Sequence, residues 1–387
     1  MIPAGIATQR PANAKLLVID QRGAITHRAR ADFPALVREG DVVVANDAAT
    51  LPASLTGVHL PTGEMVEVRL AGRDSLLPRE VTRFTAVVFG AGDFRTPTEN
   101  RPAPPVLHPG DALRLGPLPA TVAAVLAHPR LIEIRFETGV PEIWDGLARH
   151  GRPIQYAYVP HPLAIWDTWT RFASLPVAFE APSAGFILDW TTIASLRARG
   201  AAFVTLTHAA GISSTGDAAL DRLLPLDEPY YIPSSTAASI GACTRRGGRV
   251  IAIGTTVVRA LEDAARADGT IRPGAGIATL RIGPLTLLRR VDAIVSGTHE
   301  PGTSHYELLR AFQNDEVLRR MERDANILGY RTHEFGDSIW LEREDRASLS
   351  IESQSPRCAR RSSGARRGDD GRHRERRCSA RARALAP

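Results

Sequence analysis

Lysine, cysteine and long apolar runs are scarce in this chain of 387 residues. Lysine occurs once, at Lys15, and arginine supplies the other basic side chains, which is typical of a GC-rich coding sequence rather than of selection for guanidinium groups. Two of the three cysteines, Cys358 and Cys378, lie near the C-terminal end, which leaves only Cys243 in the rest of the chain. Neither a disulfide framework nor a cysteine metal site is therefore supported.

The sequence predicts neither export nor membrane insertion. No run of about 18 uninterrupted apolar residues occurs. The opening MIPAGIATQRPANAKLL lacks the order of a basic stretch followed by an apolar one that a signal peptide requires. We expect a cytoplasmic protein that has no contact with a membrane.

The net charge of +6 comes from the C-terminal end. Residues 351–387 hold eleven arginines and four acidic residues, a local charge of +7 that leaves −1 for residues 1–350. Because residues 350–387 have almost no aliphatic side chains and no periodicity, we expect a disordered basic tail. Two interpretations of the tail stay open: it is out-of-frame sequence, or it is an arm that binds RNA.

The distribution of apolar residues predicts an α/β protein with a second, all-β module. A chain of this length with 43% hydrophobic residues favours two domains. Residues 57–145 contain short alternating strands with turn signals, a pattern typical of a small β-barrel or sandwich. Strands and helices alternate after residue 145, which predicts a largely parallel sheet covered on both faces. The β module therefore interrupts an α/β domain formed by residues 1–56 and 146–349.

The clearest local signal for a binding site is the strand RVIAIG followed by the helix TTVVRALE. Free N–H groups at the start of such a helix can hold a carboxylate or phosphate, with Arg259 one turn further along. The alternative is that Thr255 only caps the helix. His299 and His305 lie in a loop-like stretch without further predicted metal ligands, so we expect surface or capping roles and no metal. The sequence contains no G-x-G-x-x-G fingerprint and no G-x-S-x-G elbow.

Six segments in order resemble one known family. They read DVVVANDAATLPASL, TRFASLPVAFEAPSAGF, AAFVTLTHAAG, RVIAIGTTVVRALE, VDAIVSGTHEPGTSHYELLRAF and HEFGDSIWLE. These resemble the signature segments of the S-adenosylmethionine:tRNA ribosyltransferase-isomerases of queuosine biosynthesis, from about residue 15 to residue 341. The resemblance implies a three-layer α/β sandwich with an inserted β-barrel.

The resemblance also implies a reaction. Family members transfer and isomerise the ribosyl part of S-adenosylmethionine onto 7-aminomethyl-7-deazaguanine in tRNA, and release adenine and methionine. S-adenosylmethionine is then a substrate rather than a prosthetic group, no metal is required, and tRNA is a possible partner.

Functional residues follow from the resemblance position by position. Proton transfer falls to Glu228 and His299, because deprotonation beside a sulfonium and protonation of the departing adenine both need titratable groups. Substrate binding falls to positions that match the family's motifs, with Ser183 in place of a threonine: Asn46, Asp47, Tyr158, Ser183, Gly185, Gly254, Thr255, Thr256 and Arg259. We expect these side chains to converge on one cleft.

Departures from the family pattern keep two other functions open. Ala48, Ala49 and Ser54 stand where the family has threonine and two arginines, and His208 lies one residue later than the family's histidine. One alternative is a paralogue that uses a small-molecule acceptor. The other is a non-catalytic protein that binds RNA or a nucleoside.

Overall fold

The computed structural model describes residues 1–344, so the tail expected at 350–387 lies outside the described residues. Within residues 1–344, the largest sheet has nine strands. In spatial order they are β16 (Gly274–Ala278), β14 (Glu228–Ile232), β13 (Ala202–His208), β4 (Val42–Asn46), β15 (Val250–Ile253), β17 (Ala293–Gly297), β19 (Ser338–Glu342), β2 (Lys15–Ile19) and β3 (Ile25–Ala29).

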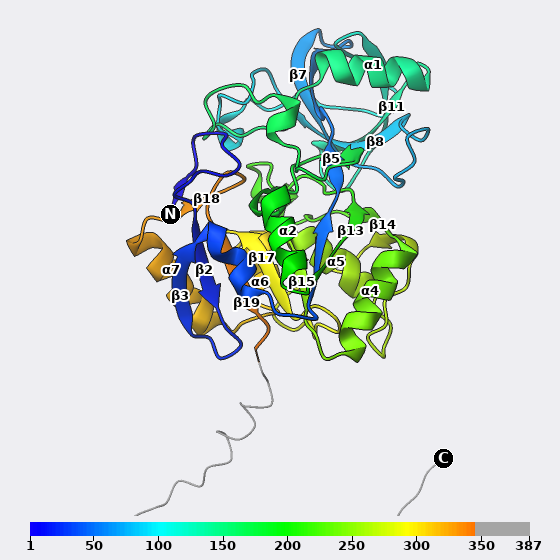
Figure 1. Cartoon of the computed structure of the whole chain (residues 1–387). Coiled ribbons are helices and arrows are strands. Elements are labelled where there is room, and N and C mark those ends of the chain that lie inside the picture. The colour runs from blue at the N-terminus through cyan, green and yellow to red at the C-terminus, as the bar shows by residue number, and fades with distance from the viewer. Residues whose placement is uncertain (345–387) are drawn as a thin grey trace, which may run out of the picture. The chain divides into compact units, whose positions relative to one another are not determined.

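The four central strands of this sheet are parallel. β4 pairs with β13 on one side and β15 on the other, and β15 pairs with β17. Their near-continuous apolar sequence suits strands that are covered on both faces. Because the strands are parallel, their carboxyl ends meet at one edge of the sheet (Figure 1). This is the edge at which an open α/β sheet binds ligands.

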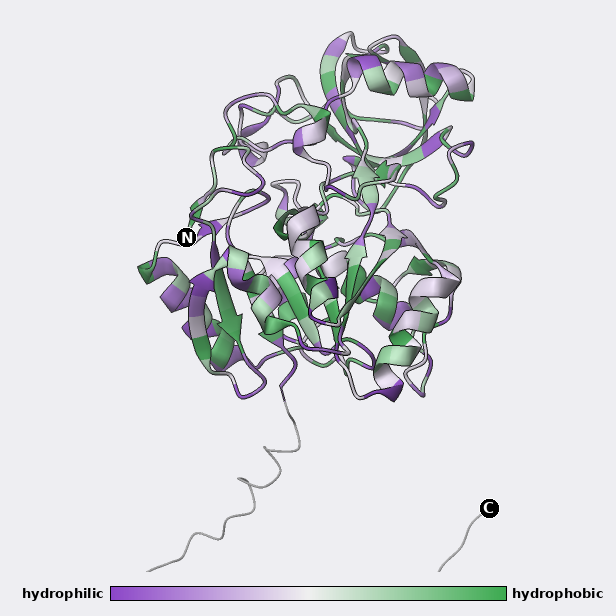
Figure 2. Ribbon diagram, viewed as in Figure 1, coloured by the Kyte–Doolittle hydropathy of each residue, from purple (hydrophilic) through white to green (hydrophobic). Residues whose placement is uncertain are grey.

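Helices cover both faces of the sheet, which confirms the predicted three-layer arrangement. Val42 and Val44 pack in the core that contains residues of α4 (Ser234–Arg245), α5 (Thr255–Ala264), α6 (Ser304–Leu309) and α7 (Asp315–Ile327). Val43 and Ala45 point the other way, into the core formed with η1 (Arg30–Leu36), η4 (Ser183–Ile187) and α2 (Trp190–Ala198). Alternate side chains of one strand thus serve opposite layers. Hydrophobic residues gather on the strands between these layers (Figure 2).

The β module is a closed barrel rather than a sandwich. Its strands, in order around the barrel, are β10 (Leu118–Val125), β11 (Leu131–Phe136), β8 (Arg83–Phe89), β7 (Glu64–Gly72), β6 (Ser54–His59) and β9 (Ala112–Leu115). Closure pairs every strand on both sides and leaves no free edge. The inward-facing residues form a core of their own, which includes Val68, Phe84 and Ile134.

The apolar spacing in FPALVREG, residues 33–40, predicts a short α-helix, and that in IWDGLARHG, residues 143–151, predicts a helix of the α/β domain. The first segment instead contains a 3-10 helix at Arg30–Leu36 with Pro34, whose ring nitrogen cannot donate to an α-helical carbonyl. The second segment forms α1 (Val140–His150), and its Ile143 and Leu147 pack into the barrel core instead of against the sheet. The described residues cluster as one compact unit, so the division at residues 57 and 145 stays a prediction.

Short elements complete the described part of the chain. β1 (Ile2–Pro3) pairs with β18 (Arg331–Thr332), and β5 (Ala48–Thr50) pairs with β12 (Leu175–Ala178). The remaining helical turns are η2 (Thr98–Asn100), η3 (Ile165–Asp167) and α3 (Ala218–Asp221). No helix within residues 1–344 combines the length and the apolar composition needed to cross a membrane.

Replacement of Trp340 tests the packing between the sheet and the layer formed by η1, η4 and α2. This side chain is fully buried, and its ring lies 6.1 Å from that of Phe33 and 5.6 Å from the Arg249 guanidinium carbon. We expect Trp340→Ala to lower the free energy of unfolding by about 3–5 kcal/mol, because a large cavity is left behind. Urea unfolding followed by circular dichroism measures the change. Trp190→Ala is the matched control, since Trp190 is 64% exposed; an equal loss in both variants would contradict the packing described here.

Candidate active site

A cavity of about 450 Å³ lies at the carboxyl edge of the parallel strands. Residues that directly follow β13, β15 and β17 line it, together with residues of η4, α5, α6 and the loop after β18. This is the edge at which open α/β sheets bind ligands. Seven of the predicted site residues line this cavity: Ser183, Glu228, Gly254, Thr255, Thr256, Arg259 and His299.

The N-terminus of α5 opens into this cavity. Gly254 ends the turn after β15 with φ of +97°, a conformation that glycine adopts without strain, and an added Cβ would lie 3.3 Å from the Ala184 Cβ. Gly254, not Thr255, holds the N-cap position, and it has no side chain to cap the helix. The first-turn N–H groups of α5 therefore lack a side-chain cap, and the helix dipole adds partial positive charge there.

Glu228 and Arg259 form a buried ion pair in the cavity wall. The Arg259 guanidinium donates to the Glu228 carboxylate and also to the carbonyl oxygens of Leu226 (3.0 Å) and Ala278 (2.8 Å). The Gly211 N–H donates to the second Glu228 oxygen at 2.6 Å. Burial raises the pKa of Glu228, while Arg259 and the Gly211 N–H act in the opposite direction. Arg259 is thus engaged within the wall, and its role in substrate binding stays a prediction.

Two histidines lie together on another side of the cavity. The rings of His299 and His305 stack with centroids 4.7 Å apart, and Nε2 of His299 lies 2.9 Å from the Ser296 hydroxyl oxygen. Burial lowers the pKa of His299 well below its usual value, and the neighbouring His305 and His333 add to this effect. Burial also lowers the pKa of His305 to about 4. Both imidazoles are therefore neutral at pH 7. The expected surface or capping role of His305 is wrong, because its side chain lines the cavity.

Comparison with known proteins places the whole described fold in one family. The family described as "Queuosine biosynthesis protein" matches residues 2–341. The chain belongs to this family. One relative, the S-adenosylmethionine:tRNA ribosyltransferase-isomerase of Rhodopseudomonas palustris, is 31% identical over 89% of this chain and 96% of its own length. The protein of the same name from Azoarcus sp. is 33% identical over 89% and 96%.

Among solved structures, an S-adenosylmethionine tRNA ribosyltransferase from Thermotoga maritima aligns with 88% of this chain and 94% of that chain. The sequence identity is 20% and the TM-score is 0.44.

Asn46 lies behind the cavity rather than in its lining. Its amide nitrogen donates to the His208 carbonyl at 2.9 Å and to the Thr256 hydroxyl at 3.4 Å. Its amide oxygen accepts from the N–H groups of His208 (2.9 Å) and Ala48 (3.1 Å). With all these contacts the side chain is 2% exposed and joins the ends of β4 and β13 to the start of α5. Asn46 therefore supports the cavity from outside.

Three further predicted residues also lie outside the lining of the large cavity. Asp47 accepts a hydrogen bond from the Thr207 hydroxyl at 2.7 Å, and burial raises its pKa. Gly185 acts through its backbone, because an added Cβ would lie 2.8 Å from Thr170 Cγ2. Tyr158 lines a second, much smaller cavity of about 20 Å³, which has room for about one water molecule.

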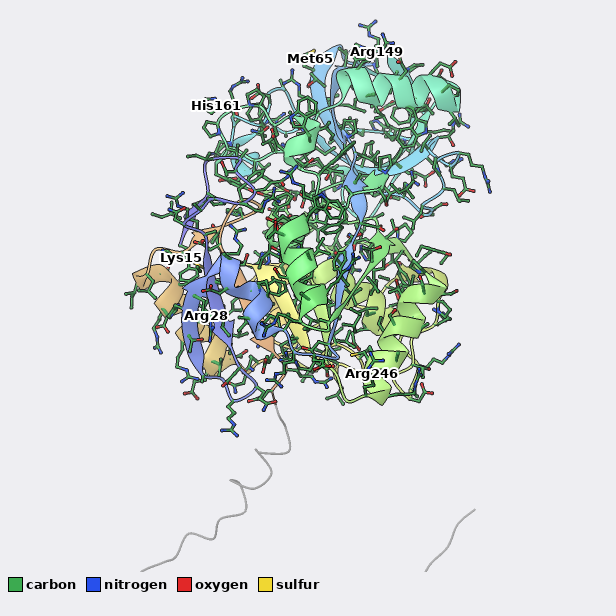
Figure 3. All side chains as sticks on the ribbon, in the orientation of Figure 1. Lys15, Arg28, Met65, Arg149, His161 and Arg246 are labelled. Carbon is green, nitrogen blue, oxygen red and sulfur yellow. The ribbon has the colours of Figure 1, made fainter. Side chains whose placement is uncertain are left out.

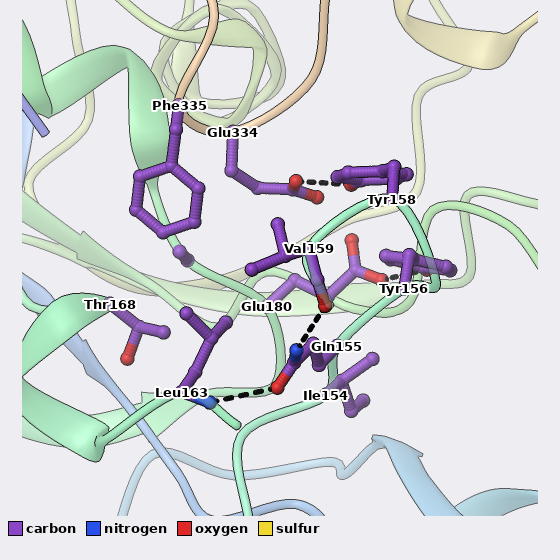
Figure 4. A pocket seen from close by; sticks show the side chains of 11 residues that line it. Ile154, Gln155, Tyr156, Tyr158, Val159, Leu163, Thr168, Glu180, Glu334 and Phe335 are labelled. Atoms are coloured by element: carbon purple, nitrogen blue, oxygen red, sulfur yellow. Dashed lines mark hydrogen bonds between the residues drawn. The ribbon is translucent and has the colours of Figure 1, made fainter. Parts of the chain in front are cut away.

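Two carboxylates that join the two cavities are not among the predicted site residues, although both lie within the segments that resemble the family. Glu180, which follows β12, and Glu334, which lies between β18 and β19, line both cavities. Tyr156 and Tyr158 contact these carboxylates (Figure 4). Each contact joins residues that are far apart in the sequence, so the pairing of tyrosine with glutamate does not follow from the motifs alone. Within residues 1–344, no group of three or more His, Cys, Asp or Glu side chains is placed to hold a metal ion.

The pKa of Glu180 predicts a specific pH dependence of stability. Burial raises this pKa to about 7, and nearby Glu334 adds to the effect, while hydrogen bonds with Ser213 and Tyr156 oppose it. The folded protein therefore binds a proton that the unfolded chain releases between pH 4.5 and pH 7. The contribution of Glu180 to stability is present below pH 4.5 and is lost as the pH rises through 7.

As the pH rises from 5 to 8, we expect the free energy of unfolding of Glu180→Gln to increase relative to that of the wild type by on the order of 3 kcal/mol. Urea unfolding at several pH values measures this difference. Glu316→Gln, which replaces an exposed side chain at the start of α7, should show no such trend. If the free energies of unfolding of the wild type and Glu180→Gln changed with pH in parallel, the raised pKa of Glu180 would be contradicted.

Proposed function

We propose that the protein transfers and isomerises the ribosyl part of S-adenosylmethionine onto 7-aminomethyl-7-deazaguanine in tRNA. The bonds from the ribosyl group to the methionine sulfur and to adenine break, and two bonds form: one to the acceptor amine and one within the isomerising ribosyl group. The amine and the carbon beside the sulfonium each lose a proton, and the departing adenine takes up one proton. The observation that carries the proposal is the family match across residues 2–341, combined with the convergence of seven predicted site residues on one cavity.

The start of α5 is suited to hold the methionine carboxylate of S-adenosylmethionine. The first-turn N–H groups around Thr255 and Thr256 lack a side-chain cap and carry the positive end of the helix dipole. Both residues line the cavity, and η4 lies opposite the turn at Gly254. A tRNA phosphate is the other anion that this helix start could accept.

Of the two candidates for proton transfer, His299 is the better placed. Its imidazole is neutral at pH 7 and lines the cavity, and the Ser296 hydroxyl orients its ring. It can therefore accept a proton from the carbon beside the sulfonium. Glu228 also lines the cavity, but proton transfer from its carboxylate would disturb the ion pair with Arg259. Glu228 thus stays a second candidate, with a supporting role through Arg259.

One observation favours a small-molecule acceptor as the alternative to tRNA. Residues 1–350 carry a net charge of −1, whereas proteins that bind an RNA backbone usually present clustered basic side chains. A paralogue of this kind would bind S-adenosylmethionine and have no affinity for tRNA.

An assay of adenine release tests the proposed function. We expect the full-length protein to bind S-adenosylmethionine in calorimetric titration and to release adenine only when tRNA with the 7-aminomethyl-7-deazaguanine base is present. Binding without release would favour the small-molecule acceptor. Tail-dependent, salt-sensitive RNA binding without turnover would favour the non-catalytic alternative. No binding of S-adenosylmethionine would refute the proposed reaction.

Replacement of His299 tests its assignment within that reaction. We expect His299→Gln to lower kcat by about 10²- to 10⁴-fold with a small change in KM, because proton transfer is impaired while binding contacts remain. His161→Gln is the matched control, since His161 is exposed at the molecular surface, where Figure 3 labels it. An unchanged kcat in His299→Gln would assign proton transfer to another group.

A further inference from the structure

The boundary between the two cavities contains a pair of carboxylates held by a pair of tyrosines. The Tyr156 hydroxyl donates to Glu180, and the Tyr158 hydroxyl donates to Glu334 (Figure 4). The two phenol rings stack with centroids 5.9 Å apart and an interplanar angle of 12°. Ring stacking thus fixes the two hydroxyls side by side, and each hydroxyl orients one carboxylate.

The loop that carries Glu334 is itself held in place. His333 adopts a φ of +70°, an uncommon conformation for a residue other than glycine, and its ring stacks on Tyr158 with centroids 4.2 Å apart. The row of stacked rings therefore runs from Tyr156 through Tyr158 to His333. A carboxylate next to such a row has little freedom to turn away from the cavity.

Neither carboxylate has a cationic partner in the described part of the chain. No Lys, Arg or His nitrogen of residues 1–344 forms an ion pair with Glu180 or Glu334. Glu180 accepts hydrogen bonds from Tyr156 and Ser213, and Glu334 accepts one from Tyr158. The two carboxylates repel each other, since the charge of Glu334 helps to raise the pKa of Glu180. A cation bound to both would relieve this repulsion.

A second observation is a buried hydroxyl without a hydrogen-bond partner near Glu334 in the sequence. Thr332, two residues before Glu334, lines the larger cavity and is 1% exposed. Its hydroxyl oxygen has no hydrogen-bond partner among residues 1–344. Buried hydroxyls are nearly always paired in folded proteins, so an unpaired one in a cavity wall marks a position that a ligand can complete.

We propose that Glu180 and Glu334 bind a primary ammonium group of the ligand, with Thr332 as an additional acceptor. An ammonium has three donors and a compact charge, which suits two carboxylates that line the same cavity and one hydroxyl oxygen. The proposal rests on the proposed function for the identity of the ligands. Two amines of that reaction have the required chemistry: the α-amino group of S-adenosylmethionine and the aminomethyl group of the acceptor base.

Ligand pairs that differ only in the amine test this site. One pair is S-adenosylmethionine and its analogue without the α-amino group; the other is 7-aminomethyl-7-deazaguanine and 7-methyl-7-deazaguanine. Calorimetric titration of the full-length wild type, Glu180→Gln and Glu334→Gln with each ligand completes a double-mutant cycle. We expect the wild type to prefer the amine in one pair by about tenfold or more, and the variants to lose most of that preference.

The pair that shows the preference identifies the source of the ammonium. Glu316→Gln is the control and should retain the wild-type preference, because Glu316 is exposed on α7. Thermal unfolding establishes that each variant is folded. Should Glu180→Gln fail to fold, Glu334→Gln and Tyr158→Phe give independent answers, since Tyr158→Phe removes the hydroxyl that orients Glu334.

The outcomes separate this proposal from the proposed function. An amine preference that persists in the glutamine variants, or its absence from both pairs in the wild type, overturns the ammonium site even if tRNA-dependent adenine release is observed. An amine preference for the free base that depends on the two glutamates supports the site even if S-adenosylmethionine does not bind. The latter result would overturn the proposed reaction alone.

Discussion

The buried pair of Glu228 and Arg259 is the interaction on which the cavity depends. Removal of two charges from water costs several kcal/mol per ion and is offset only when both groups complete their hydrogen bonds. The Gly211 N–H and the carbonyls of Leu226 and Ala278 supply those bonds. They join α5 to β14, to β16 and to the loop after β13, so that the open N-terminus of α5 has a fixed place in the wall.

Elsewhere in the cavity wall, groups of both signs of charge lack an oppositely charged partner among residues 1–344. The start of α5 contributes positive potential from backbone N–H groups, while Glu180 and Glu334 contribute negative charge held by phenol hydroxyls. His299 and His305 in the cavity wall are kept neutral by burial, so they do not cancel the charge of the carboxylates. Such an interior suits a ligand that carries a carboxylate and an amine.

Much of the fold could be predicted because its signals are local. The apolar run at residues 42–46, the alternation at 65–72 and the turn at Gly254 each follow from a few neighbouring residues. Prediction failed where distant packing decides the outcome. Pro34 turned an expected helix into a 3-10 turn, and α1 joined the barrel because Ile143 and Leu147 fit the apolar residues that the barrel leaves uncovered. Periodicity shows that a face is apolar, but not which surface will cover it.

The sequence by itself determined the family, the order of the elements and the seven site residues that line the cavity. These features depend on short segments of neighbouring residues, such as the family motifs and the residues at the start of α5. Only the tertiary structure decided the partners. It paired Arg259 with Glu228, placed Asn46 behind the wall, and brought Glu180 and Glu334 together from distant segments. Hydrogen bonds and ion pairs between distant segments depend on distances that chain folding sets, and no spacing along the sequence encodes them.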